Sequence, residues 1–233
     1  MTDTLLFENI KNIYREISSA AIRSGRSPFD VRLVAVTKTV SIELMREAAD
    51  LGLRIFGENR VQEAQQKITA CRLQCPECRI EWHMIGHLQR NKAKIAVQLF
   101  DLIHSLDSLP LAEDLNTYAE KEGKIQRVLI EVKLSGEEAK QGISRQALMG
   151  FIGSVAGMAN LKLEGLMTMP PFFDDPEQAR PYFRELRQLR DEAQRAGHEL
   201  PELSMGMTHD FEAAILEGAT MVRIGTGIFG ERR

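Results

Sequence analysis

The chain has 233 residues, which suits one large domain or two small ones, and 43% of them are hydrophobic, enough for a sizeable core. Its 30 basic and 33 acidic residues leave a net charge of -3, which argues against a nucleic-acid-binding protein. The N-terminus lacks the apolar core of a signal peptide, and no apolar run approaches a membrane span, so we expect no membrane partner; with only three cysteines, this predicts a cytoplasmic protein.

Short apolar runs alternate with longer amphipathic stretches along the whole chain. A first helix is predicted at about Thr4–Ser24. The predicted strands are Arg32–Thr37, Arg54–Phe56, Glu81–Ile85, Leu102–Ser105, Arg127–Val132, Lys162–Leu166, Glu202–Met205 and Met221–Ile224. The predicted helices between them are Ile42–Asp50, Val61–Ala70, Asn91–Leu99, Leu109–Glu122, Arg145–Ala156, Pro176–Ala196 and Asp210–Glu217.

This alternation favours a parallel sheet, since parallel strands need helical crossovers. Eight strands in a chain of this length favour a single closed (β/α)8 TIM-type barrel with an extra N-terminal helix, with an open doubly wound sheet as the alternative. We therefore expect one domain over residues 1–233. In such a barrel, functional groups gather where strands end and the following loops begin.

Lys38 follows the first predicted strand directly, in the stretch RLVAVTKTVS. Two interpretations of this residue stay open. A lysine at a strand end commonly extends its ammonium group into water. Alternatively, apolar neighbours such as Val34 and Val36 lower the pKa of the amine and leave a nucleophile able to form a Schiff base.

The loops after the last two predicted strands both contain glycine. Ser204, Gly206 and Thr208 lie in the first loop, and Gly225 and Thr226 lie in the second. Glycine lets backbone N–H groups approach an anion, and hydroxyl groups add donors. Loops in these two positions are the usual phosphate site of a TIM barrel, so the sequence favours phosphate binding over two ordinary tight turns. Arg223 lies two residues before the second loop.

Seven sequence blocks carry a resemblance to a known family. They are LVAVTKT, FGENRVQEA, EWHMIGHLQRNK, HSLDS, EGLMTM, LSMGMTHDFEAAI and VRIGTGIFG, in order over residues 30–229. Together they resemble the pyridoxal phosphate homeostasis family (YggS/PROSC type). The resemblance implies a single barrel similar to the N-terminal domain of alanine racemase.

The resemblance also implies a set of residues that bind pyridoxal 5'-phosphate (PLP). Lys38 would carry PLP as a Schiff base, and Arg223 would face the pyridine nitrogen. The phosphate would lie against Ser204, Gly206, Thr208, Gly225 and Thr226, and Asn59 and His87 match positions near the cofactor. The sequence departs from the family pattern at Thr208, Gly227 and Lys133, where serine, alanine and asparagine are common.

The same residues bear on whether the protein is a carrier or an enzyme. An arginine beside the ring nitrogen disfavours its protonation and so weakens the electron sink that PLP enzymes use. The sequence also shows no counterpart of the second domain of alanine racemase. We therefore expect a monomeric PLP carrier in vitamin B6 homeostasis, with PLP-dependent apoenzymes as candidate acceptors and no assigned catalytic residue. A racemase-like amino-acid enzyme is the alternative.

The cysteines give a competing signal. The spacing Cys71-x3-Cys75-x2-Cys78 matches the cluster motif of radical SAM enzymes, and His83 would complete a Cys3His zinc site. However, Glu77 stands where that motif has an aromatic residue. We therefore favour a variable loop with reduced thiols and assign no metal ligand. For His104, orienting a loop at the barrel mouth and a satisfied buried position stay open as equal alternatives.

Overall fold

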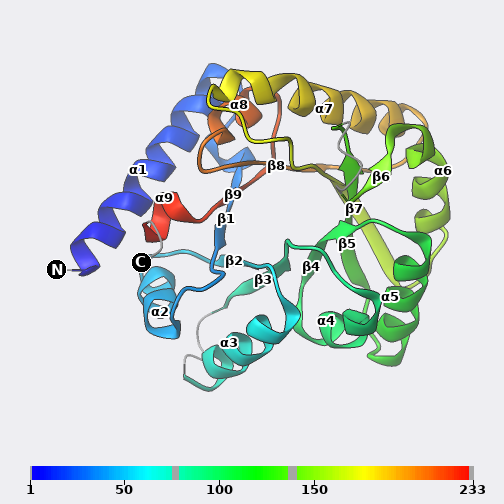
Figure 1. Cartoon of the computed structure of the whole chain (residues 1–233), viewed down its shortest axis with the longest axis horizontal. Helices are drawn as coiled ribbons and strands as arrows, with labels where there is room; N and C mark the ends of the chain where they lie inside the picture. The colour runs from blue at the N-terminus through cyan, green and yellow to red at the C-terminus, as the bar shows by residue number, and fades with distance from the viewer. Residues whose placement is uncertain (1, 75–78, 136–140, 231–233) are drawn as a thin grey trace.

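The computed structural model describes residues 2–74, 79–135 and 141–230, which form a parallel barrel inside a ring of helices (Figure 1). The barrel strands are β1 Arg32–Val36, β2 Ile55–Glu58, β3 Glu81–Met84, β4 Leu102–Leu106, β5 Gln126–Lys133, β7 Leu161–Met167, β8 Glu202–Met207 and β9 Met221–Ile224. They pair in chain order, and pairings of β4 with β5 and of β1 with β9 close the ring. The predicted TIM-type fold is confirmed.

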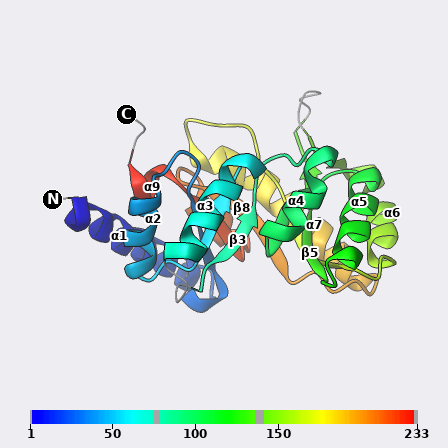
Figure 2. The same cartoon turned by 90° about the horizontal axis from the view of Figure 1, so that it is seen from below.

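Helices cover the outside of the barrel, as the edge-on view also shows (Figure 2). They are α1 Thr2–Arg23, α2 Ile42–Asp50, α3 Val61–Gln74, α4 Ala93–Leu99, α5 Leu109–Lys121, α6 Arg145–Ala156, α7 Arg180–Arg195, α8 Phe211–Leu216 and α9 Thr226–Phe229, with 3-10 turns at Pro28–Asp30, Arg90–Lys92 and Pro176–Ala179. Within the described residues, no helix combines the length and apolarity that crossing a membrane requires.

Local sequence explains where two of the helices begin. The side chains of Ser41 and Ser144 cap α2 and α6 by accepting hydrogen bonds from Leu44 N and Ala147 N, both at 3.3 Å. The short strand β6, Ile143–Ser144, pairs with β5 outside the barrel and was not predicted, because two residues are too few to show an alternating pattern. The helix predicted from Pro176 starts as a 3-10 turn before α7.

The strands bury both of their faces, which is why they read as continuous apolar runs. Outward-facing side chains such as Phe56 and Leu203 pack under the helices in the main core. A second, smaller cluster lies inside the barrel and comprises Val34, Ile85, Leu102, Leu129, Met167 and Met221. Each fully buried side chain of this size contributes about 1.5–3 kcal/mol.

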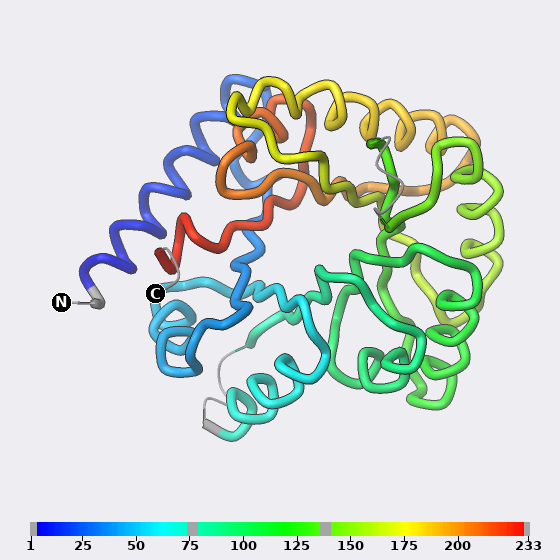
Figure 3. Tube along the Cα trace, viewed as in Figure 1, coloured from blue at the N-terminus to red at the C-terminus, as the bar shows by residue number. Residues whose placement is uncertain are grey.

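The pairing of β1 with β9 brings the two ends of the chain together, and the trace shows the first and last strands side by side (Figure 3). Ala35 is in register with Ile224, so the loop after β1 lies beside the loop after β9. Helix α1 packs over α8 and α9, and Asn9 Nδ2 donates to Ile228 O at 2.9 Å. We call the carboxyl ends of the barrel strands, with the loops after them, the mouth.

Candidate functional site

The turn that carries Lys38 begins one residue after β1 ends, and the lysine is half-buried. Its neighbour Thr39 has a φ of 64°, the single positive value at a non-glycine residue in the described chain. A left-handed residue of this kind costs about 1–2 kcal/mol, so the surroundings must hold it. The hydrogen bond from Thr39 N to Glu63 Oε1, 2.6 Å long, does so.

A cluster of the buried Glu58 and Lys67 with the half-buried Glu63 holds the residues on both sides of Lys38. Lys67 Nζ donates to Thr37 O at 2.5 Å, to Glu58 Oε1 at 2.9 Å and to Glu63 Oε1 at 2.6 Å. Thr37 Oγ1 donates to Glu58 Oε1 at 2.6 Å. The residues on both sides of Lys38 are therefore tied to β2 and α3.

Burial and hydrogen bonding act against each other in this cluster. Burial raises the pKa of Glu58, although hydrogen bonds from Thr37 and Lys67 offset part of the shift. Burial would also raise the pKa of Glu63, but hydrogen bonds from Lys67 and from Thr39 N lower it overall. The sequence analysis did not identify this cluster, although the i,i+4 spacing of Glu63 and Lys67 on one helix face was a visible signal.

The loops after β8 and β9 meet at the mouth. Thr226 Oγ1 lies 3.3 Å from Thr208 Oγ1, so the two hydroxyl groups that the sequence singled out face one another. Gly206 has a φ of 92°, and a Cβ there would lie 2.6 Å from Ala214 Cβ, so no larger residue fits. A Cβ on Gly225 would lie 3.4 Å from Val36 Cβ, which places this loop directly against the end of β1.

Arg223 lies on β9 inside the barrel, with only 3% of its surface exposed. Its NH1 group donates to Ser204 Oγ at 2.6 Å and its NH2 group donates to Thr168 O at 3.0 Å. Burial lowers its pKa to about 10, while the nearby carboxyls of Asp210 and Glu131 act in the opposite direction, so the guanidinium stays charged at neutral pH. A guanidinium has five N–H donors, and two have acceptors among the described residues.

Asn59 and His87 follow β2 and β3 at the same end of the barrel. Asn59 Oδ1 is buried and has no hydrogen-bond partner among the described residues. His87 is exposed at the rim, with Nδ1 3.2 Å from Asp107 Oδ2. Sequence reasoning did not identify Glu131 on β5, which is 5% exposed and whose pKa is raised by burial and by Asp107.

Ser204 lies deeper than the sequence suggested. Its hydroxyl accepts from Arg223 and contacts His104 Nδ1 at 2.9 Å, both inside the barrel. It therefore does not face the hydroxyls of Thr208 and Thr226. Ser204 lies in β8 two residues before Gly206. This position explains the difference, because alternate residues of a barrel strand point inward at successive depths.

The cysteines do not form a site within the described residues. Cys71 is buried in α3, whereas Cys75 and Cys78 lie outside the residues that the structure describes. His83 points into the barrel, where Nε2 contacts Glu81 and Nδ1 contacts His104, so both ring nitrogens are engaged. No group of three or more candidate metal ligands occurs in residues 2–74, 79–135 and 141–230.

The mouth fits the group that the sequence resemblance implies. A Cβ on Gly206 would meet Ala214 and Phe211 of α8, so β8 packs closely against that helix, and the hydroxyl groups of Thr208 and Thr226 face one another beside it. Arg223 keeps donors for an acceptor atom, and Asn59 has an oxygen that needs a donor. Lys38 lies on a fixed turn directly after the neighbouring strand, β1. These are the group types that a phosphorylated pyridine aldehyde requires.

Comparison with known proteins identifies the family of the chain. Residues 8–233 match the model of the alanine racemase N-terminal domain. A pyridoxal phosphate homeostasis protein of Aquifex aeolicus is 46% identical over 227 residues, covering 97% of this chain and 98% of the relative. The protein of the same name from Escherichia coli K12 is 40% identical over 231 residues, covering 96% and 95%.

A solved structure extends the comparison to the fold. PipY of Synechococcus elongatus PCC7942, a structure with PLP bound, superposes with a TM-score of 0.82 at 36% sequence identity. The match covers 94% of this chain and 100% of PipY. From sequence and fold together, the chain belongs to the pyridoxal phosphate homeostasis protein family, a branch of the proteins that share the alanine racemase N-terminal domain.

Proposed function

We propose that the protein binds PLP at the mouth of the barrel, through Lys38, and serves vitamin B6 homeostasis as a single-domain carrier. One observation supports this most strongly. The pairing of β1 with β9 brings the lysine turn beside a loop rich in glycine and hydroxyl groups, although the two lie far apart in the sequence. The names of the relatives and the PLP in PipY support the same conclusion.

In this proposal each mouth residue has one task. The Nζ amine of Lys38 condenses with the aldehyde carbon of PLP, forming a C=N bond and releasing the aldehyde oxygen as water. Backbone and hydroxyl groups of Gly206, Thr208, Gly225 and Thr226 bind the phosphate. Arg223 donates to the ring nitrogen, and Ser204 acts through Arg223. Asn59 and His87 line the ring.

The same arrangement argues for a carrier over an amino-acid enzyme. PLP supplies catalysis by drawing electrons into a protonated ring, and a permanently charged arginine disfavours that protonation. Arg223 is buried and is held by two hydrogen bonds, which supports a fixed position for it beside the ring in this proposal. We propose that the protein holds PLP and delivers it to PLP-dependent apoenzymes. The monomeric state and the cytoplasmic location stay predictions from the sequence.

A binding experiment tests the cofactor assignment. The purified full chain is titrated with PLP and, separately, with pyridoxal, and the visible spectrum is followed. Because the glycine loops bind the phosphate, PLP should bind about 100-fold more tightly than pyridoxal, a difference of about 2.7 kcal/mol. Equal affinity for the two compounds would contradict the phosphate site, and no binding of either would contradict the whole proposal.

A turnover experiment tests the carrier assignment. The PLP-loaded protein is incubated with each common L- and D-amino acid, and racemisation, transamination and decarboxylation are measured. The proposal predicts no saturable turnover. Turnover of one amino acid that is lost in Lys38→Ala would establish the racemase-like alternative.

A further inference from the structure

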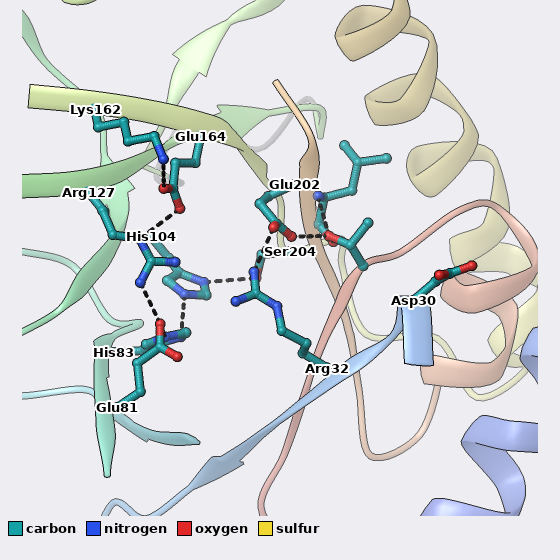
Figure 4. A network of polar contacts seen from close by, with 12 residues as sticks. Asp30, Arg32, Glu81, His83, His104, Arg127, Lys162, Glu164, Glu202 and Ser204 are labelled. Atoms are coloured by element: carbon teal, nitrogen blue, oxygen red, sulfur yellow. Dashed lines mark hydrogen bonds and ion pairs between the residues drawn. The ribbon is translucent and has the colours of Figure 1, made fainter. Parts of the chain in front are cut away.

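A continuous file of side chains crosses the barrel interior from its base to Arg223. His83 Nε2 lies 3.0 Å from Glu81 Oε1, and His83 Nδ1 lies 2.9 Å from His104 Nε2. His104 Nδ1 lies 2.9 Å from Ser204 Oγ, which lies 2.6 Å from Arg223 NH1. Figure 4 shows Glu81, His83, His104 and Ser204 in this order.

The four inner residues of the file are almost fully enclosed. His83, His104 and Ser204 have no exposed surface, and Arg223 has 3%. Burial lowers the pKa of both histidines, and the charges of Arg32, Arg127 and, for His104, Arg223 add to this shift, while the hydrogen bond and charge of Glu81 offset part of it at His83. Both rings are therefore neutral at pH 7, and each has one nitrogen that donates and one that accepts.

The two ends of the file determine the direction of every hydrogen bond in it. Arg223 has no acceptor atom, so Ser204 Oγ must accept from it. At the other end, hydrogen bonds from His83 and Arg127 lower the pKa of Glu81 to about 2, so its carboxylate only accepts. The donors therefore run from Arg223 to Ser204, His104, His83 and Glu81, with both rings protonated on Nε2.

The reverse direction is unfavourable at both ends. It would place the bare Nε2 of His83 against the carboxylate of Glu81, so two acceptors would face one another at 3.0 Å. It would also give Ser204 Oγ two donors, Arg223 and His104, and leave its own proton without a partner among the described residues. A carboxylate at the base thus selects the tautomer of a ring near the mouth.

We propose that this file is a positioning relay: Glu81, His83 and His104 keep Ser204 as an acceptor and thereby hold the Arg223 guanidinium in place beneath the mouth. The relay explains how a buried cation is accommodated without a hydrogen-bonded carboxylate among the described residues. Aligned hydrogen bonds polarise one another, so the negative charge of Glu81 strengthens each bond of the file up to the Arg223 guanidinium. The expected effect of the relay on PLP binding rests on the proposed function. The expected tautomers of His83 and His104 do not depend on it.

The first test needs no ligand. The imidazole nitrogens of the full-length 15N-labelled protein are observed by NMR at pH 7 in the wild type, Glu81→Gln and the control Glu164→Gln. Glu164 is the matched control because it binds the same Arg127, at 2.9 Å, but lies outside the file. We expect His83 and His104 to be protonated on Nε2 in the wild type and in Glu164→Gln.

In Glu81→Gln the amide both donates and accepts, so the direction is no longer fixed. We expect a population of Nδ1–H rings in this variant only. A wild-type ring protonated on Nδ1 or on both nitrogens would overturn the relay. So would unchanged tautomers in Glu81→Gln, or the same change in Glu164→Gln.

The second test connects the relay to the mouth. Glu81→Gln should weaken PLP binding about tenfold, which corresponds to about 1.4 kcal/mol, while Glu164→Gln should leave it within twofold of the wild type. Equal PLP affinity in the wild type and Glu81→Gln would overturn the positioning role even if the tautomers are as expected. If the wild type binds no PLP, the proposed function fails, and the NMR result still decides the tautomers.

Discussion

The two ends of the barrel use polar side chains in opposite ways. At the base, where the strands begin, charged residues pair with one another: Arg32 with Glu202 at 2.7 Å, and Arg127 with Glu81 at 2.6 Å and Glu164 at 2.9 Å. At the mouth, Arg223 keeps unused donors and Asn59 Oδ1 has no partner in the described chain.

This difference favours the mouth over the base as the place for a ligand. Buried polar groups are normally satisfied, so each one that is not indicates a missing partner or a functional role. At the base the charged side chains are paired with one another, and these ion pairs contribute to stability, although Gln126 Oε1 at the start of β5 has no hydrogen-bond partner among the described residues. At the mouth, the Glu58–Glu63–Lys67 cluster holds the backbone turn that carries Lys38. The predictions below test this contrast.

Lys67→Met should have the largest effect on stability. It removes the cation between Glu58 and Glu63 and leaves the Glu58 carboxylate buried without its ion pair, so we expect a loss of about 3–5 kcal/mol in the free energy of unfolding, measured with urea. The double variant Lys67→Met/Glu58→Gln should recover part of this loss. No recovery would show that Lys67 acts by packing alone.

Gly206→Ala should have the next largest effect, a loss of about 3 kcal/mol in the free energy of unfolding. The substitution combines a left-handed φ of 92° with a Cβ that would lie 2.6 Å from Ala214 Cβ. The matched control is Gly150→Ala in α6, where a Cβ has nothing within 4 Å and should stabilise the helix by about 0.5–1 kcal/mol. Similar changes in the two variants would mean that Gly206 is not specifically required.

The interior between the two ends gives a pH prediction. Because the native pKa values of His83 and His104 are lowered, the unfolded chain binds more protons below its ordinary histidine pKa of about 6.5. The contribution of these two rings to stability is therefore full above pH 6.5 and falls as the pH decreases below it. Glu58 and Glu131, with raised pKa values, act oppositely.

NMR titration separates these contributions, since it follows each ring directly. We expect neither His83 nor His104 to gain a proton between pH 8 and about 6. A ring that titrates at pH 6.5 or above would contradict the enclosed, neutral file.

The smallest effect should come from the exposed edge of the base. Lys162 is 66% exposed and pairs with Glu164 at 3.0 Å, so Lys162→Ala should change the free energy of unfolding by less than about 0.5 kcal/mol. The same urea experiment measures it. A loss above 1 kcal/mol would show that the base ion pairs form a cooperative network.

Sequence predicted the architecture well because strands buried on both faces leave continuous apolar runs at each barrel position. It also placed Lys38, Arg223 and the glycine loops at one end, since strand ends are fixed by chain order. It could not place Ser204 against His104, 100 residues earlier, because that contact depends on inward depth in the closed barrel. The roles of the PLP-binding residues came from family resemblance and stay predictions.

The central claim is that Lys38 holds PLP at the mouth, and trapping the bond tests it most directly. The wild type, Lys38→Ala and the control Lys133→Ala, a lysine at the end of β5, are loaded with PLP, reduced with borohydride, digested and mapped by mass spectrometry. We predict a pyridoxyl adduct on Lys38 in the wild type and in Lys133→Ala, and none in Lys38→Ala. An adduct on another lysine of the wild type, or one that persists in Lys38→Ala, would contradict the account.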